Sequence, residues 1–143
     1  QYVWHTFYID APAIRYYDPD TDGLSIATQY FTHDANFNVT ALTDDTGAVI
    51  ERYDYTPYGQ RFVLNPDFTN HASSDSSYEQ ELGFQGLQHD SKTELIDNRY
   101  RIWLAHLGRF SQRDPFGYPD GMNAYVGYHV IWGGLTPLER RAG

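Results

Sequence analysis

The sequence predicts an all-β protein made of stacked antiparallel β-hairpins, with a polar loop and little helix. Aromatic residues make up 17% of the 143 residues, and aromatic rings are favoured in strands and in cross-strand pairs. The 12 glycines and 7 prolines supply turns at short intervals, many of them beside Asp or Asn. The runs between these turns are short and alternate in polarity, which is typical of strands.

Residues 1–64 are predicted to form the first group of hairpins. Tyr2–Ile9 and Ala13–Tyr17 have the pattern of two short strands, and Gln29–His33 follows an acidic turn as a third. Each run alternates weakly, so the expected strand ends are approximate.

The clearest hairpin in the sequence consists of Phe37–Thr43 and Val49–Tyr55, joined by the turn Asp44–Gly47. A second turn, Thr56–Gly59, leads into a further strand over Gln60–Leu64. The three strands are therefore expected to form an antiparallel meander.

The rest of the chain divides into three parts. Residues 65–80 are rich in Ser, Asn, Asp and Pro and are predicted to form an exposed polar loop. Residues 81–127 restart the pattern of strands and turns. In residues 128–143 the pattern degrades, and the last of these residues are expected to form a frayed tail.

Composition excludes several classes of function. The formal net charge of -9 and the pI near 4.8 disfavour nucleic acid and anionic lipid as partners. The absence of cysteine excludes disulfides and thiolate chemistry. No apolar run is long enough to insert into a membrane. A start at Gln1 indicates a processed chain or a fragment.

Several short motifs, in a fixed order and spacing, carry a family resemblance. They are Gly47, Tyr53-Asp54-Tyr55, Pro57-Tyr58-Gly59, Leu107-Gly108-Arg109-Phe110, Asp114-Pro115-Phe116-Gly117 and Gly121-Met122-Asn123-Ala124-Tyr125. With these motifs most of residues 30–127 resemble the C-terminal part of RHS/YD-repeat proteins, including the RHS repeat-associated core domain. Thr93-Glu94-Leu95 departs from the family pattern, because Glu94 stands where the family has a turn glycine.

The resemblance implies a spiral of β-hairpins that closes into a hollow shell around a C-terminal passenger, at the bacterial cell surface or outside the cell. The leading hypothesis is therefore a non-catalytic structural segment of such a shell or scaffold. Its expected partners are the remainder of a larger shell or copies of itself, because stacked hairpins leave open edges that pair. Pairing of copies predicts a homo-oligomer or a filament.

A second hypothesis is a self-cleaving core domain that releases the passenger. The family uses an Arg and two Asp in an aspartic-protease-like step, and Arg101 and Asp114 match the Arg and the first Asp. Thr136 stands where the second Asp belongs, and Glu139 where a Gly belongs. In this hypothesis another carboxylate, such as Glu139, would have to replace the missing Asp. Two neighbouring carboxyls divide the roles of acid and base, and a lone one does not. We therefore expect this site to be inactive.

A third hypothesis is a surface module that binds calcium or glycan. Asp18, Asp20 and Asp22, followed by Gly23, have the alternating spacing of a calcium loop, in which carboxylates converge on the ion. The twelfth loop position is Gln29 rather than the usual Glu, so weak Ca²⁺ binding is expected, and the alternative is a solvated acidic turn. Ca²⁺ is the one cofactor that the sequence indicates.

Glycan binding would use a platform of aromatic faces. The tyrosines considered for it are Tyr53, Tyr55, Tyr58, Tyr100, Tyr118 and Tyr125. A simpler interpretation makes them the ladder of side chains between neighbouring hairpins.

Overall fold

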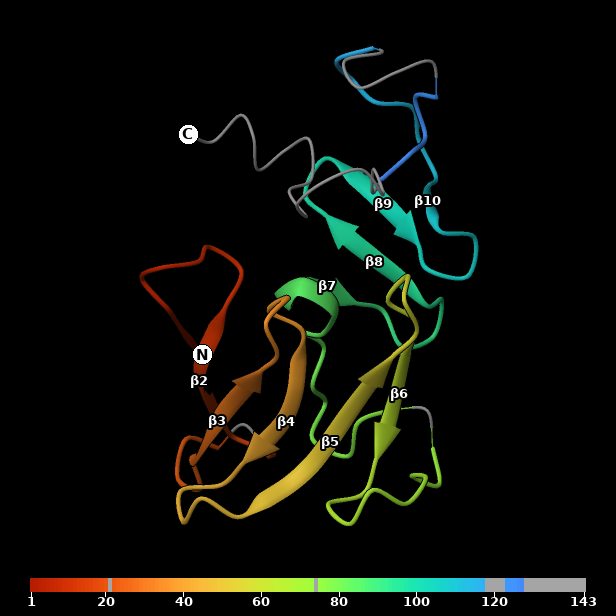
Figure 1. Ribbon diagram of the computed structural model, residues 1–143. Helices are drawn as coiled ribbons and strands as arrows, with labels where there is room; N and C mark the ends of the chain where they lie inside the picture. Colours follow the sequence, from red (N-terminus) through yellow and green to blue (C-terminus); the bar gives the residue numbers. More distant parts are fainter. Residues whose placement is uncertain (21, 74, 118–122, 128–143) are drawn as a thin grey trace.

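Two antiparallel sheets make up the protein (Figure 1). The structure is a computed structural model, and it describes residues 1–20, 22–73, 75–117 and 123–127. The first sheet has six strands, which are β1 (Tyr2–Trp4), β2 (Pro12–Tyr17), β3 (Ala27–His33), β4 (Val39–Thr43), β5 (Val49–Tyr55) and β6 (Arg61–Leu64). The second sheet has four, which are β7 (Gln88–His89), β8 (Leu95–Asn98), β9 (Arg101–Leu104) and β10 (Arg109–Phe110).

The predicted all-β fold class is confirmed. The described residues contain one short 3-10 turn, η1 (Phe84–Gly86), and no α-helix. None of their elements is a helix of the length and apolarity that crossing a membrane requires. In both sheets each strand pairs with its neighbours in the sequence, so every connection is a hairpin.

Strand β1 is shorter than the run Tyr2–Ile9 that the sequence predicted. The register shifts between Val3 and Trp4, and the next amide, that of His5, donates to the carbonyl of Ala11 at 2.8 Å. The chain therefore turns away soon after Trp4 and returns as β2. The register shift leaves Ala13 without a partner on β1, as in a β-bulge, and pairing continues beyond it at Trp4 and Pro12.

The core of the first sheet lies on one face. Phe31, Val39, Leu42, Tyr53 and Val63 form a buried cluster. Alternation aligns most of these side chains, and the register shift in the pairing of β3 with β4 brings Val39 to the same face as Leu42. Most of the described residues of 65–80, the predicted polar loop, are exposed. At the end of this stretch Tyr78 packs on the cluster, and Gln80 is 1% exposed.

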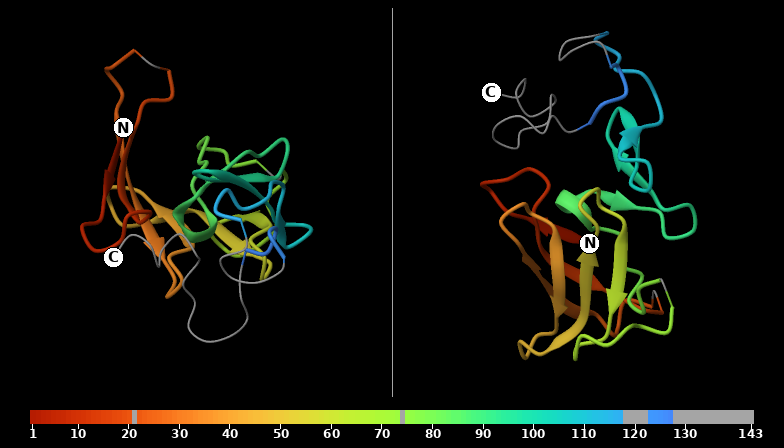
Figure 2. Two further views of the ribbon diagram at one scale, coloured as in Figure 1. Left: turned by 90° about the horizontal axis from the view of Figure 1, so that it is seen from above. Right: turned by 45° about the vertical axis from the view of Figure 1, so that its right-hand side comes forward.

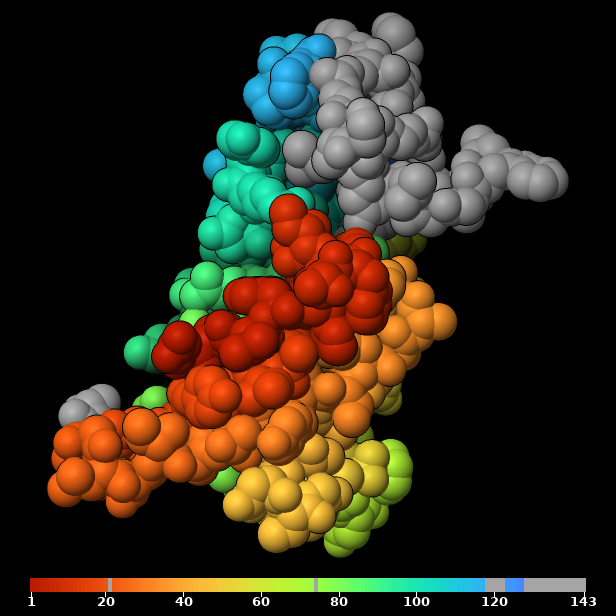
Figure 3. All heavy atoms as spheres, turned by 90° about the vertical axis from the view of Figure 1, so that its left-hand side faces the viewer, coloured from red at the N-terminus to blue at the C-terminus, as the bar shows by residue number. Residues whose placement is uncertain are grey.

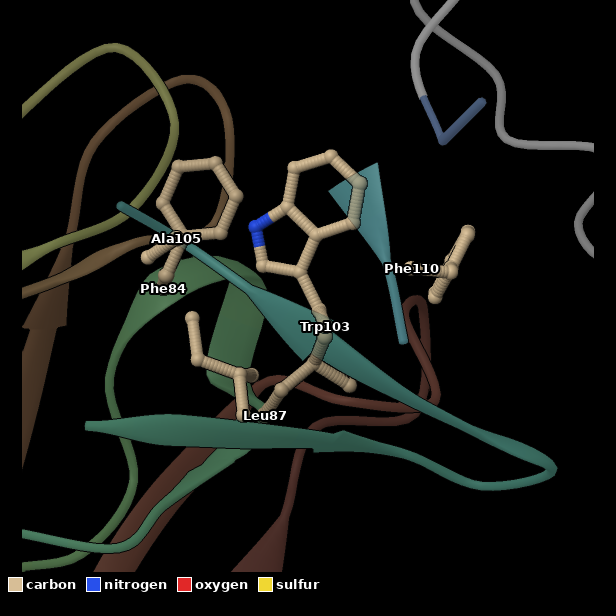
Figure 4. Close-up of a cluster of buried hydrophobic side chains, with 6 residues drawn as sticks. Phe84, Leu87, Trp103, Ala105 and Phe110 are labelled. Atoms are coloured by element: carbon tan, nitrogen blue, oxygen red, sulfur yellow. The ribbon is translucent and has the colours of Figure 1, made fainter. Parts of the chain in front are cut away.

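The core of the second sheet is centred on Trp103. Figure 4 shows its indole between the rings of Phe84 and Phe110. The rings of Trp103 and Phe110 meet edge to face, with centroids 5.1 Å apart, which is a favourable aromatic geometry. Ile96, fully buried on β8, completes this layer.

Several polar contacts join the two sheets. The indole N–H of Trp103 donates to the carbonyl of Tyr58 at 2.8 Å, and the amide of Gln85 donates to Oδ1 of Asn38 at 2.9 Å. Asp10 accepts two hydrogen bonds from Arg99, at 2.6 and 2.7 Å. In Figure 3 the N-terminal residues, in red, accordingly lie against the teal strands of the second sheet.

Gly86 is required at one of these junctions. A Cβ on this residue would lie 1.5 Å from the carbonyl oxygen of Asp10, and its φ of +70° is in the left-handed region that favours glycine. The backbone of η1 can therefore approach the N-terminal loop closely only at a glycine.

Three of the four sheet edges are at least partly covered. The amide of His71 donates to the carbonyl of Val63 on β6 at 3.3 Å. The amide of His89 on β7 donates to Glu81 at 2.7 Å, and that of Phe110 on β10 donates to Tyr125 at 2.9 Å. The fourth edge is β1, and no described residue pairs with its outer side.

Candidate functional site

The two residues matched to the family's cleavage site lie together. Arg101 begins β9, and its Nη2 is 3.3 Å from Oδ2 of Asp114, with both side chains largely buried. The guanidinium also lies over the ring of Phe110, with its Cζ 3.6 Å from the ring centroid. Arg101 is therefore held between a carboxylate and an aromatic face, a geometry that suits a planar cation.

Asp114 also shapes a turn in the chain. Its Oδ1 accepts the amide of Phe116 at 2.8 Å, and its carbonyl accepts the amide of Gly117 at 3.0 Å. Pro115 and Gly117 occupy the second and fourth positions, where such turns favour them. The Asp-Pro-Phe-Gly motif thus has a local structural reason, independent of any catalytic role.

An acid pair would need a second carboxyl beside Asp114. Within the described residues the polar side-chain contacts of Asp114 are with Arg101 and the amide of Phe116, and none is with another carboxyl group. Thr136 and Glu139, the positions matched to the second motif, lie outside the described residues. The described contacts of Asp114 therefore form an ion pair and stabilise a turn.

Asp18, Asp20 and Asp22 also come together. One carboxylate oxygen from each lies within 4.8 Å of the others, in the turn between β2 and β3. Figure 2 shows this turn projecting from the body of the protein (left view, red to orange). The amide of Gly23 donates to Asp18 at 2.8 Å, and a hydrogen bond to Asp18 raises the pKa of Asp20. Three carboxylates this close together can serve as ligands of a calcium ion.

Gln29, the twelfth position of the predicted calcium loop, is not part of this cluster. It lies in β3 opposite Arg15 and is 2% exposed. Its Oε1 is buried and has no hydrogen-bond partner among the described residues. The three aspartates are therefore the carboxylate ligands that this turn offers to a calcium ion.

The tyrosines considered for a sugar platform do not share one surface. Tyr53 is buried in the core of the first sheet, Tyr55 is partly buried and packs against the cores of both sheets, and burial raises the pKa of both hydroxyls. Tyr58 packs under Gly108, and Tyr100 is 74% exposed in the turn between β8 and β9. Tyr118 lies outside the described residues.

One buried polar site was missed by sequence reasoning. Glu51 is 2% exposed, and its carboxylate accepts hydrogen bonds from the hydroxyl of Tyr53, from Oγ of Ser76 at 2.5 Å and from the amide of Ser77 at 2.8 Å. The alternation of β5, which places Glu51 on the face of Tyr53, was the available signal. The partners Ser76 and Ser77 lie too far along the chain for a sequence pattern to connect them.

No model of a protein family matches the chain. Toxin protein Tse5 of Pseudomonas aeruginosa is 44% identical over 47 residues, which are 33% of this chain and 4% of that protein. Double-stranded DNA deaminase toxin A of Burkholderia cenocepacia is 31% identical over 98 residues, which are 64% of this chain and 6% of that protein. The chain therefore spans a small fraction of the length of these relatives.

Solved structures share the fold. A crystal structure of TcdB2-TccC3-Cdc42 has a TM-score of 0.58 and 25% identity, over 70% of this chain and 4% of that one. A crystal structure of TcdB2-TccC3 has a TM-score of 0.60 and 23% identity, over 73% of this chain and 5% of that one. The similar regions therefore cover 70% and 73% of this chain and only a small part of the solved structures.

Proposed function

Because the chain is a segment from the C-terminal part of an RHS-repeat protein, we propose that it is a non-catalytic piece of the wall of an extracellular shell. The proposal rests on which edge strands of the two sheets already have hydrogen-bond partners. Contacts on β6, β7 and β10 at least partly cover three of them, whereas β1 is open among the described residues. A wall segment with one open edge joins its neighbour on that side.

The hydrogen-bond pattern of β1 supports this arrangement. Gln1 and Tyr16 exchange two backbone hydrogen bonds, of 2.8 and 3.1 Å, so that pair faces inward. In an antiparallel ladder the inward and outward positions alternate. The backbone N–H and C=O of Val3 therefore point toward β2, whereas the amides of Tyr2 and Trp4 point outward. There a neighbouring strand of a longer shell would accept their hydrogen bonds.

The open edge of β1 also determines how isolated copies of the chain associate. Two copies can pair β1 against β1 around a twofold axis, and that contact closes on itself. A filament would need a second open edge on each copy. We therefore infer a weak closed dimer for the isolated chain and a continuous wall for the complete protein.

The absence of catalysis rests on the contacts of Asp114. Its carboxylate binds Arg101 and caps a turn, which is a structural role, and Thr136 is not a carboxylate that could complete an acid pair. Intact mass over time tests this part of the proposal. We expect one species of 16.5 kDa throughout. A pair of fragments that together make up this mass would establish self-cleavage instead.

A further inference from the structure

A cleft of about 960 Å³ lies between the first sheet, at β6, and strands β7 to β9 of the second sheet. This volume is within the range of about 300–1,000 Å³ that ligand pockets occupy. The charged residues that line it are mainly acidic: Asp75, Glu79, Glu81, Asp90 and Asp97, against Arg61 and Lys92. The carboxylates of three of them, Asp75, Glu79 and Asp97, make no hydrogen bond or ion pair with a described residue.

A second, independent feature of the cleft is His89. This side chain lines the cleft and is 6% exposed. Its Nε2 accepts the amide of Phe84 at 2.9 Å, so the neutral ring carries its proton on Nδ1. No described residue accepts that N–H, and Nδ1 is not among the fully enclosed polar atoms. The ring thus presents one fixed donor from a buried position.

The other edge of the ring is occupied by the backbone. A Cβ on Gly83 would lie 2.9 Å from Cδ2 and Nε2 of His89, so this edge faces the Gly83–Phe84 peptide. The Nδ1 edge faces away from it. A small pocket of about 30 Å³, room for one water, shares Arg61 and His89 with the cleft. A water in this pocket, or a ligand group that replaces it, can accept the hydrogen bond of Nδ1–H.

We propose that this cleft binds an extended basic peptide segment, with a backbone carbonyl on Nδ1–H of His89 and cationic side chains on the carboxylates of Asp75, Glu79 and Asp97. Two observations select this chemistry. The carboxylates attract a cation, and the fixed imidazole N–H needs an acceptor. A peptide with Lys or Arg side chains offers both groups.

Other cationic ligands lack one of these groups. A polyamine carries positive charge but has no acceptor for the imidazole N–H. A metal ion would need a ring nitrogen with a free lone pair, and Nε2 is already an acceptor while Nδ1 carries the proton. The proposed site is independent of whether the chain is a wall segment, because it depends only on residues 61–102.

The test is a titration of the full chain, at moderate salt, with a short blocked peptide of alternating lysine and serine. Nitrogen NMR of the histidine rings follows His89 directly. We expect its Nδ1 resonance to move and saturate with this peptide. The same peptide with glutamate in place of lysine should leave the resonance unmoved, and spermidine should bind more weakly.

A matched pair of variants separates the site from general charge attraction. Asp75→Asn with Asp97→Asn removes two carboxylates that line the cleft, and Asp45→Asn with Asp54→Asn removes two exposed ones elsewhere. We expect the first pair to weaken peptide binding about fivefold and the second pair to change it little. Equal effects of the two pairs, binding of spermidine as tight as that of the peptide, or an unmoved His89 resonance would each overturn the proposal.

Discussion

The guanidinium of Arg101 lies 3.3 Å from the carboxylate of Asp114, and the two side chains are only 3% and 10% exposed. Breaking a buried pair by removing one partner is strongly destabilising, because the remaining charge stays buried. The contact therefore gives both residues a structural role at the start of β9, whatever chemistry related proteins perform at these positions.

Replacing Asp114 separates the structural role from the catalytic one. We expect Asp114→Asn to lower the free energy of unfolding by about 2 kcal/mol, since Arg101 loses its counter-charge. Thermal unfolding measures this loss, and intact mass of the wild type and the variant should be equally stable in time. Cleavage of the wild type that Asp114→Asn abolishes would instead make Asp114 a catalytic residue.

Glu94 occupies a position that favours glycine. Its φ is +57°, in the region where a side chain costs about 1 kcal/mol or more. We expect Glu94→Gly to raise the melting temperature by about 3 °C. Glu94→Ala is the control, because it removes the same charge and keeps the Cβ. An equal gain from both variants would point to charge rather than to the backbone.

Stability should fall as the pH falls below neutral, because burial lowers the pKa of His89 to about 3. Its unfolded pKa is about 6.5, so the unfolded chain binds more protons between these values, and the stability present above pH 6.5 is lost toward pH 3. Burial and the nearby His5 lower the pKa of His33 in the same direction.

From pH 7 to pH 5 the contribution of His89 to the free energy of unfolding should fall by about 2 kcal/mol. Urea unfolding at the two pH values measures the change. His89→Gln keeps an acceptor for the amide of Phe84 and does not titrate, so its loss should be smaller. A loss as large in His89→Gln as in the wild type would assign the effect to other groups.

Calcium should bind weakly where Asp18, Asp20 and Asp22 gather. We expect a dissociation constant of about 1 mM. Free calcium at about ten times that concentration should raise the melting temperature by about 3 °C. Magnesium should have a smaller effect, because it releases its waters reluctantly. Asp20→Asn should remove the response. A melting temperature indifferent to calcium and chelator would leave this turn as a solvated acidic loop.

Local patterns predicted most of the first sheet. The hairpin of β4 and β5 was expected from alternation and from the turn at Asp44–Gly47, where Oδ1 of Asp44 accepts the amides of Thr46 and Ala48. The covering of the sheet could not be predicted. The segment that contains Ser76 is polar. It packs on the sheet because Ser76 hydrogen-bonds the buried carboxylate of Glu51, a contact that no local sequence pattern indicates.

Some residues of the candidate sites could likewise be predicted from the sequence, and others could not. The three aspartates of the β2–β3 turn are close in sequence, so their spacing predicted their clustering. Arg101 and Asp114 were named by resemblance, and the structure adds their contact. No sequence pattern indicated His89 as a site residue, because its role depends on its hydrogen bond with the amide of Phe84 and on a cleft formed by both sheets.

Light scattering combined with intact mass distinguishes a non-catalytic wall segment that continues through β1 from a self-cleaving or filament-forming chain. We expect intact chains of 16.5 kDa in a reversible equilibrium between monomer and a dimer of twice that mass. Trp4→Pro removes an outward amide of β1 and should leave only monomer, whereas Trp4→Ala keeps that amide and should still dimerise. Fragments of the chain would show self-cleavage, and large assemblies that persist in Trp4→Pro would show that the chain associates through surfaces other than the edge of β1.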